Sequence, residues 1–308
     1  MKTAAADGDA ALTGVGAHDG ARGFDARRAS LSRLWRLKWG LAAAALLLLI
    51  VASAALAPWL ASYDPLAVDI QHRLVPPVWM DGGTPRHPLG TDQIGRDLLT
   101  RLLYGGRVSL IVGVTAVLVS ATMGVLTGLA AGYFGPRVDW LIMALVNVML
   151  SFPFVLLALA VIAVLGPSLV NMIIVLAVAD WPLYVRVIRA ETLAICERDF
   201  VTAGRALGMS HARIVFRQIV PNLVSVIVVI ATLQVARVII LESFLSFLGL
   251  GVQPPTPAWG NMLGEGRVYM LNSWWIAAFP GLAIFVTTLA INLMGNGLRD
   301  WLDPHMKL

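Results

Sequence analysis

Several uninterrupted apolar stretches, each long enough to cross a lipid bilayer, constrain what this chain can fold into. A helix needs about 20 apolar residues to span the roughly 30 Å hydrocarbon layer. The stretches that meet this requirement are residues 40–60, 108–133, 138–165, 169–188, 223–245 and 275–298. The sequence therefore predicts an all-α membrane protein with six transmembrane helices.

The composition excludes a soluble globular domain. Of the residues, 58% are hydrophobic and 13% are charged, whereas soluble domains have about half and about a quarter. The net charge is +5, but Lys and Arg gather near the ends of the apolar stretches, which favours membrane orientation over nucleic-acid binding. The chain has one cysteine, Cys196, and five scattered histidines, so we expect neither an internal disulfide nor a metal site.

The N-terminal part of the chain divides into a tail, an anchor and a loop. Residues 1–39 are expected to be a cytoplasmic tail whose last part, residues 27–39, is either an interfacial helix on anionic lipid or the basic flank of the first span. Residues 40–60 favour an uncleaved anchor over a signal peptide, whose apolar core is only about 7 to 15 residues. Residues 61–107 are polar and rich in Pro and Gly, which predicts an extracytoplasmic loop. Within it, residues 98–103 fit either a short interfacial helix or a lead-in to the next span.

Residues 108–298 form the predicted five-helix core, and residues 299–308 a short cytoplasmic tail. The second span carries small residues at spacings typical of helices that approach closely in membranes, so we expect it inside the bundle. An even number of spans places both termini on one side, and basic residues prefer the cytoplasmic side. Arginines of the N-terminal segment and of the loop at 189–222 both favour the cytoplasmic side for these segments. The loop after the first span is a partial exception, because it also carries Arg73, Arg86, Arg96 and Arg101. We therefore expect a multi-pass membrane protein with both termini cytoplasmic.

The loop at residues 189–222 is patterned rather than a random connector. Its first half places Phe200, Ala203, Gly204 and Leu207 on one helical face. Gly208 is suited to the left-handed conformation that ends a helix, and Ser210 is a good N-cap for a second helix. The loop is thus predicted to hold two short amphipathic helices joined at a glycine. Its small-residue face would let a soluble partner approach closely.

This loop resembles the EAA motif of permeases in binding-protein-dependent ABC importers, which reads Glu-Ala-Ala, three residues, Gly, nine residues and an apolar stretch ending in Leu-Pro. Here the motif falls on Thr202-Ala203-Gly204, on Gly208 and on Ile219-Val220-Pro221. Thr202 replaces the family's Glu, so a capping box with Asp199 as N-cap would be weaker; Gly204 and Val220 also depart from the pattern. The resemblance implies a type I ABC importer permease bundle whose coupling loop docks an ATPase. The implied docking residues are Asp199, Phe200, Thr202, Ala203, Gly204, Arg205, Leu207, Gly208, Arg213 and Pro221.

Three further runs resemble the C-type permeases of dipeptide and oligopeptide importers. They are residues 87–97, 101–110 and 245–260, and the resemblance covers nearly the whole chain after residue 36. It implies an importer of short peptides in the cytoplasmic membrane of a bacterium, with nickel chelates or glutathione as alternative solutes. The implied partners are a homologous second permease, two cytosolic ATPases that hold ATP and Mg, and an extracytoplasmic solute-binding protein that lands on the loop after the first span and on residues 253–274. No cofactor is expected on this chain itself.

Missing motifs argue against a motor or an enzyme on this chain. ATP hydrolysis needs a phosphate cradle, typically Gly, four residues, Gly-Lys-Ser/Thr. None of the lysines, Lys2, Lys38 and Lys307, lies in such a cradle. Neither Gly-x-Ser-x-Gly nor His-Glu-x-x-His occurs. Energy must therefore come from another chain or from an ion gradient.

An ion-coupled secondary transporter is the alternative functional class, because ionisable residues lie inside the predicted spans. These residues are Asp180, Arg237 and Glu242. Such residues contact solute, relay protons or form structural pairs. Arg237 and Glu242 are five positions apart, which places them poorly for one helix face. We favour a structural pair near a helix end or at a subunit interface.

Overall fold

The computed structural model describes residues 38–302, so nearly all of the tail and interfacial segment predicted at 1–39, and most of the tail predicted at 299–308, lie outside the described residues. Within the described range the chain forms helices and loops and no β-strand, apart from an isolated bridge between Thr91 and Asp97. The prediction of an all-α fold is confirmed.

Within that range, five helices are long and apolar enough to cross a membrane. They are Lys38–Ala55, α3 (Leu98–Tyr133), α6 (Leu169–Cys196), the continuous helix His211–Phe247 that ends in α9 (Val220–Phe247), and α11 (Trp275–Leu302). A sixth span is present if the bent pair α4 (Pro136–Ser151) and α5 (Phe154–Leu165) counts as one. The shorter elements are α2 (Ala57–Leu60), η1 (Ile70–His72), α7 (Asp199–Ala206), α8 (His211–Ile214), η2 (Val215–Ile219), α10 (Trp259–Gly266) and η3 (Arg267–Tyr269).

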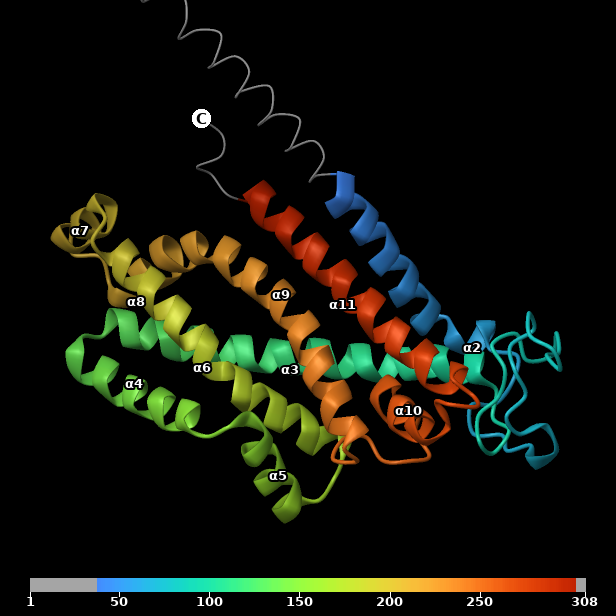
Figure 1. The fold of residues 1–308 in the computed structure, drawn as a ribbon. Helices are drawn as coiled ribbons and strands as arrows, with labels where there is room; N and C mark the ends of the chain where they lie inside the picture. Colours follow the sequence, from blue (N-terminus) through green and yellow to red (C-terminus); the bar gives the residue numbers. More distant parts are fainter. Residues whose placement is uncertain (1–37, 303–308) are drawn as a thin grey trace, which may run out of the picture.

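The prediction of one uninterrupted helix over residues 138–165 is wrong. The axes of α4 and α5 differ in direction by 89°. Phe152, between them, has an extended backbone with ψ of 128°, because the residue before a proline is disfavoured in the α region and Pro153 follows it. Both helices contact α6, and Figure 1 shows the sharp change of direction from α4 to α5.

The helix α3 begins ten residues before the predicted second span, so residues 98–107 belong to this helix rather than to the predicted loop. Asp97 caps its start, and the carboxylate accepts the backbone N–H of Thr100 at 2.8 Å. Arg101 is only 1% exposed. No separate interfacial helix forms here, and the lead-in alternative describes the segment.

Glycines let α3 pack directly on α6. A Cβ on Gly128 would stand 2.9 Å from the Cβ of Ile188, and one on Gly132 would stand 2.7 Å from the Cβ of Thr192. Such close approach is favoured in membranes, where packing rather than hydrophobic burial holds helices together. The helix α3 also contacts α4, α9, α10 and α11, whereas Leu118 and Leu126 on another face are each 60% exposed. The helix is therefore only partly inside the bundle of this single chain (Figure 1).

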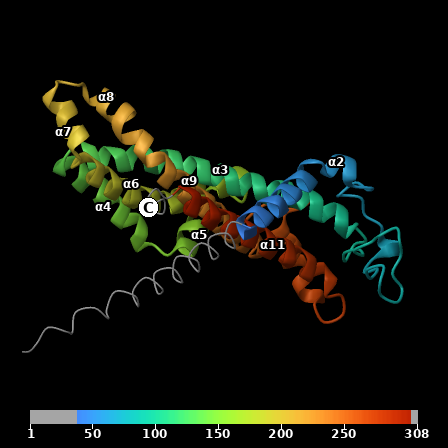
Figure 2. The ribbon, with the colours of Figure 1, turned by 90° about the horizontal axis from the view of Figure 1, so that it is seen from above.

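The first helix, Lys38–Ala55, packs along α11 (Figures 1 and 2). A Cβ on Gly40 would stand 3.4 Å from the Cα of Gly297. Figure 1 shows α7 and the Leu302 end of α11 toward one end of the bundle, with α10 and the loop that precedes α3 toward the other. The two ends of the bundle therefore carry different structures.

Candidate functional site

The site predicted from the sequence lies where α7 and α8 project from one end of the bundle (Figures 1 and 2). We call residues 199–214 the hinge segment. Between its two helices, Gly208 has a φ of +74°, which confirms the predicted left-handed joint. Within the described chain, no heavy atom lies within 4 Å of a Cβ placed on this glycine. The joint is therefore constrained by backbone conformation and not by neighbours.

The residues predicted to share one face of α7 do not all share it. Phe200, Ala203 and Leu207 are exposed, whereas Gly204 is buried beside Val201. Val201 packs into a cluster of isoleucines from α6, α8 and η2, and that cluster decides which face of α7 turns inward. The exposed face thus carries two large apolar side chains, and Leu207 is 83% exposed.

Gly204 lets α7 lie against the start of the long helix that follows. A Cβ on this glycine would stand 3.0 Å from Nε2 of Gln218 and 3.1 Å from Sδ of Met209. Gln218 Nε2 in turn donates to Met209 Sδ at 3.4 Å. Both neighbours are flexible side chains, so the alanine of the family motif would require only small shifts here.

The predicted capping arrangement of α7 is wrong. Arg198 occupies the N-cap position with an extended backbone, and Asp199 is already the first helical residue. Asp199 still contributes a negative charge to the first turn, where the helix dipole favours it. The hydroxyl of Thr202 donates to the carbonyl oxygen of Arg198 at 3.5 Å instead of accepting a backbone N–H. Ser210 takes the N-cap position of α8 as predicted, without a side-chain cap hydrogen bond.

The second short helix is not a separate element. α8 passes through the π-helical segment η2 into α9, and together they form the 37-residue helix His211–Phe247. Pro221 lies inside this helix, where it has no N–H to donate and its ring crowds the carbonyl of Arg217. The π-helical turn just before it opens the backbone. Gly208 therefore separates α7 from the long helix, to which the exposed Arg213 belongs.

A tyrosine that the sequence reasoning missed joins the hinge segment to α3. The hydroxyl of Tyr133, at the end of α3, lies 2.9 Å from Nδ1 of His211 in α8. The guanidinium of Arg205 in α7 lies over the ring of the same tyrosine, with Cζ 5.7 Å from the centroid. Both helices of the hinge segment thus contact Tyr133. Because this tyrosine lies far from both helices in the sequence, no local pattern pointed to it.

The opposite end of the bundle is held by a cluster of buried charges. Asp92 is fully buried and accepts from Nε of Arg96 and Nη1 of Arg101, both at 2.5 Å. Glu265 of α10 accepts from Nη2 of Arg96 at 2.7 Å and from Nη1 of Arg101 at 3.0 Å. Two carboxylates and two guanidinium groups therefore balance one another and fasten the loop before α3 to α10. Residues 38–302 contain no group of three or more His, Cys, Asp or Glu that could hold a metal ion.

Two of the three ionisable residues inside the spans form an ion pair between helices α6 and α9. Asp180 on α6 is 1% exposed, and its Oδ2 accepts from Nε2 of Gln234 at 2.8 Å. Nη1 of Arg237 lies 3.3 Å from Oδ1 of Asp180, so Arg237 pairs with Asp180 and not with Glu242. Glu242 is fully buried and accepts from the hydroxyl of Ser246 at 2.8 Å.

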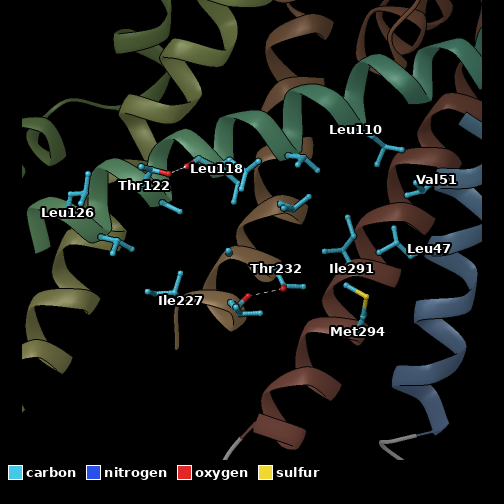
Figure 3. Close-up of a pocket in the computed structure, with 17 residues that line it drawn as sticks. Leu47, Val51, Leu110, Leu118, Thr122, Leu126, Ile227, Thr232, Ile291 and Met294 are labelled. Carbon is cyan, nitrogen blue, oxygen red and sulfur yellow. Dashed lines mark hydrogen bonds between the residues drawn. The ribbon is translucent and has the colours of Figure 1, made fainter. Parts of the chain in front are cut away.

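An apolar groove of about 670 Å³ lies between the first helix, α3, α9 and α11 (Figure 3). Leu47, Leu110, Ile227 and Ile291 bring one side chain from each of these helices to it. The hydroxyl of Thr232 on its wall is turned back to its own helix, where it donates to a carbonyl oxygen at 2.8 Å. The groove therefore offers apolar contact and no polar recognition.

Two family models match this chain, one in its C-terminal part and one in its N-terminal part. Residues 124–308 match the family described as binding-protein-dependent transport system inner membrane component. Residues 26–77 match the N-terminal TM domain of oligopeptide transport permease C.

Curated relatives match over most of their own length. The Di/tripeptide transport system permease protein DppC of Pseudomonas aeruginosa is 48% identical over 261 residues, covering 85% of this chain and 86% of the relative. The Dipeptide transport system permease protein DppC of Escherichia coli (strain K12) is 45% identical and covers 82% of this chain and 84% of the relative.

Solved structures of other proteins share the fold of this chain at low sequence identity. An inward-facing structure of the MetNI methionine ABC transporter has a TM-score of 0.54 at 18% identity and covers 66% of this chain and 96% of the matched chain. An amino acid ABC transporter crystallised with histidines has a TM-score of 0.52 at 17% identity, covering 65% of this chain and 94% of the matched one. The bundle therefore has the same fold as the matched chains of these two ABC transporters. By its sequence matches, the chain belongs to the family of binding-protein-dependent transport system inner membrane components.

Proposed function

We propose that this chain is a transmembrane permease subunit of an ATP-driven importer that moves short peptides across the cytoplasmic membrane. The observation that carries the proposal is the 48% identity to a di/tripeptide transport permease over 85% of this chain. Nickel chelates and glutathione are disfavoured because relatives at 41% to 48% identity are named for dipeptide or di/tripeptide transport.

The subunit works with chains that supply what it lacks. A homologous second permease completes the pathway, two cytosolic ATPases bind ATP and Mg, and an extracytoplasmic binding protein delivers the peptide. An ATPase docks on the exposed face of α7, where Phe200 and Leu207 offer apolar contact. ATP-driven closure of the ATPases turns α7 about Gly208, and Tyr133 passes the motion to α3. Hydrolysis resets the bundle to its inward-open state.

The hinge segment and both termini face the cytoplasm in this proposal. Arginines on the hinge segment support this orientation, because basic residues are enriched in cytoplasmic loops. The arrangement in Figure 1 is consistent with it, since α7 and the Leu302 end of α11 lie toward the same end of the bundle. The binding protein then lands on the loop before α3 and on α10.

Uptake by the reconstituted complex tests the function. Proteoliposomes that contain both permeases and both ATPases are given the binding protein, ATP and a radiolabelled dipeptide. We expect uptake that requires ATP hydrolysis, that unlabelled dipeptide suppresses and that glutathione or a nickel chelate leaves unchanged. Uptake driven by an ion gradient without ATPases would favour the secondary-transporter class and contradict the proposal.

Labelling from the two sides of the membrane tests the orientation. Cys196 is the only cysteine, so replacing it by serine leaves a background in which Ser210→Cys on the hinge segment reports alone. We expect an impermeant thiol reagent to label Ser210→Cys only in inverted vesicles. Labelling of Ser210→Cys in right-side-out vesicles would show that the hinge segment lies outside the cell, and would contradict the proposed orientation.

A further inference from the structure

Arg237 is an exposed charge in the apolar part of α9. Its side chain is 55% exposed, although the neighbours Ala236 and Val238 are buried. It lies ten residues before the helix ends at Phe247, which is about 15 Å at the helical rise per residue. That distance is about half of the hydrocarbon thickness of a bilayer. A guanidinium at such depth does not face lipid and turns to water or protein instead.

The pairing of Arg237 leaves most of its donors free. Nη1 lies 3.3 Å from Oδ1 of Asp180, and within residues 38–302 the guanidinium has no other polar partner. That carboxylate oxygen is buried and accepts no hydrogen bond, although the other oxygen accepts from Gln234. Asp180 therefore attracts the guanidinium without engaging its planar fork, which is shaped for a carboxylate.

The exposed guanidinium does not belong to the apolar groove. Val235 and Thr232 of α9 line that groove, and at 3.6 residues per turn they lie about 160° and about 140° around the helix from Arg237. One side of α9 thus offers only apolar contact, whereas the other offers a positive charge that is exposed in the single subunit. The charged side is the one suited to a polar solute.

We propose that Arg237 lines the peptide route and binds the C-terminal carboxylate of the peptide in transit, with Asp180 as the residue that positions it. This inference rests on the proposed function. A zwitterionic peptide carries one terminal carboxylate, and the guanidinium can form two parallel hydrogen bonds to it. The competing charge of Asp180 keeps the contact weak, as transit requires, because a site that binds too tightly does not release.

A carboxylate of the second permease is the competing partner for the Arg237 guanidinium. Comparing two substrates distinguishes that carboxylate from the C-terminal carboxylate of the peptide. The intact complex in proteoliposomes is given a dipeptide or the same dipeptide with its C-terminus amidated. Uptake of each is normalised to the fraction of binding protein loaded with it. We expect the unaltered complex to move the free acid faster than the amide, and Arg237→Gln to remove this preference by slowing the acid about tenfold.

Further measurements distinguish a substrate contact from a structural role. Arg237→Lys should restore part of the preference for the free acid, because the ammonium keeps the positive charge without the planar fork. The matched control is Arg186→Gln, because Nη2 of Arg186 donates to Oδ1 of Asn147 at 3.0 Å on a different face of the bundle. We expect this control to keep the full preference.

Two results would overturn the inference while leaving the proposed function standing. In one, Arg237→Gln takes up the free acid at the unaltered rate. In the other, it slows acid and amide equally, which would assign the guanidinium to a carboxylate of the second permease. If the unaltered complex moves no dipeptide at all, the proposed function itself fails.

Discussion

Gly124 of α3 lies so close to Tyr184 of α6 that a Cβ on the glycine would stand 2.3 Å from the Cβ of the tyrosine. Tyr184 is fully buried, and the carbonyl oxygen of Trp181 would be 3.2 Å from the same Cβ. Neither the tyrosine Cβ nor the backbone can move aside without moving α6. This contact therefore sets how closely the two helices approach.

Gly124→Ala should destabilise the subunit by about 3 kcal/mol, because an added methyl group forces α3 away from α6. The matched control is Gly281→Ala on α11, where the nearest atom to an added Cβ is the flexible Leu263 Cδ1 at 3.5 Å. Thermal unfolding in mild detergent measures both variants. Equal melting temperatures would show that the helices are not held at this distance.

Tyr133→Phe should weaken the link between α3 and the hinge segment. The variant keeps the ring under Arg205 but loses the hydroxyl that lies 2.9 Å from His211, and a hydrogen bond at this partly exposed position contributes at most about 1 kcal/mol. We expect little change in melting temperature and more ATP hydrolysed per peptide imported. Tyr133→Leu, which also loses the ring, should raise that ratio further. An unchanged ratio in both variants would remove Tyr133 from the coupling path.

Gly208→Val should disturb coupling through backbone conformation alone. The φ of +74° is strained for a β-branched residue by about 1–2 kcal/mol, although nothing crowds the site. Gly208→Asn is the matched control, because asparagine tolerates the left-handed region. Valine should uncouple ATP hydrolysis from uptake, and asparagine should not. Normal uptake by the valine variant would mean that the joint at Gly208 has no role.

Asp92→Asn should destabilise the protein by about 3–5 kcal/mol, because it leaves the buried guanidinium groups of Arg96 and Arg101 with one carboxylate between them. Glu265→Gln should be milder, since the side chain of Glu265 is 20% exposed and water can replace part of its contacts. Proteolysis of the loop before α3 in right-side-out vesicles measures whether that loop has come free. A larger effect for Glu265→Gln would contradict this order.

Glu242→Gln should keep the stability of the protein within about 1 kcal/mol, because the amide can still accept from the hydroxyl of Ser246. Glu242→Leu should be worse by about 1–3 kcal/mol, since it leaves the buried Ser246 hydroxyl without this acceptor. Thermal unfolding again provides the measurement. If the glutamine variant unfolded as readily as the leucine variant, the carboxylate would be needed for its charge.

Local sequence was sufficient for the joint in the hinge segment and for the existence of the spans other than residues 138–165. The length of an apolar stretch decides whether it crosses a bilayer, and a glycine after a helix predicts a positive φ, as at Gly208. The bend at Phe152 also has a local cause, because Pro153 follows it directly in the sequence.

Tertiary structure alone decided the polar partners. Arg101 meets Glu265 across 164 positions, and Arg237 meets Asp180 on another helix instead of Glu242 on its own. The inward turn of Gly204 likewise depends on the isoleucines beneath α7. A span requires only apolar residues in a row, whereas a charge pair requires two helices to present facing sides. Which sides face depends on how glycines and large side chains let the helices pack, and no single stretch of sequence contains that information.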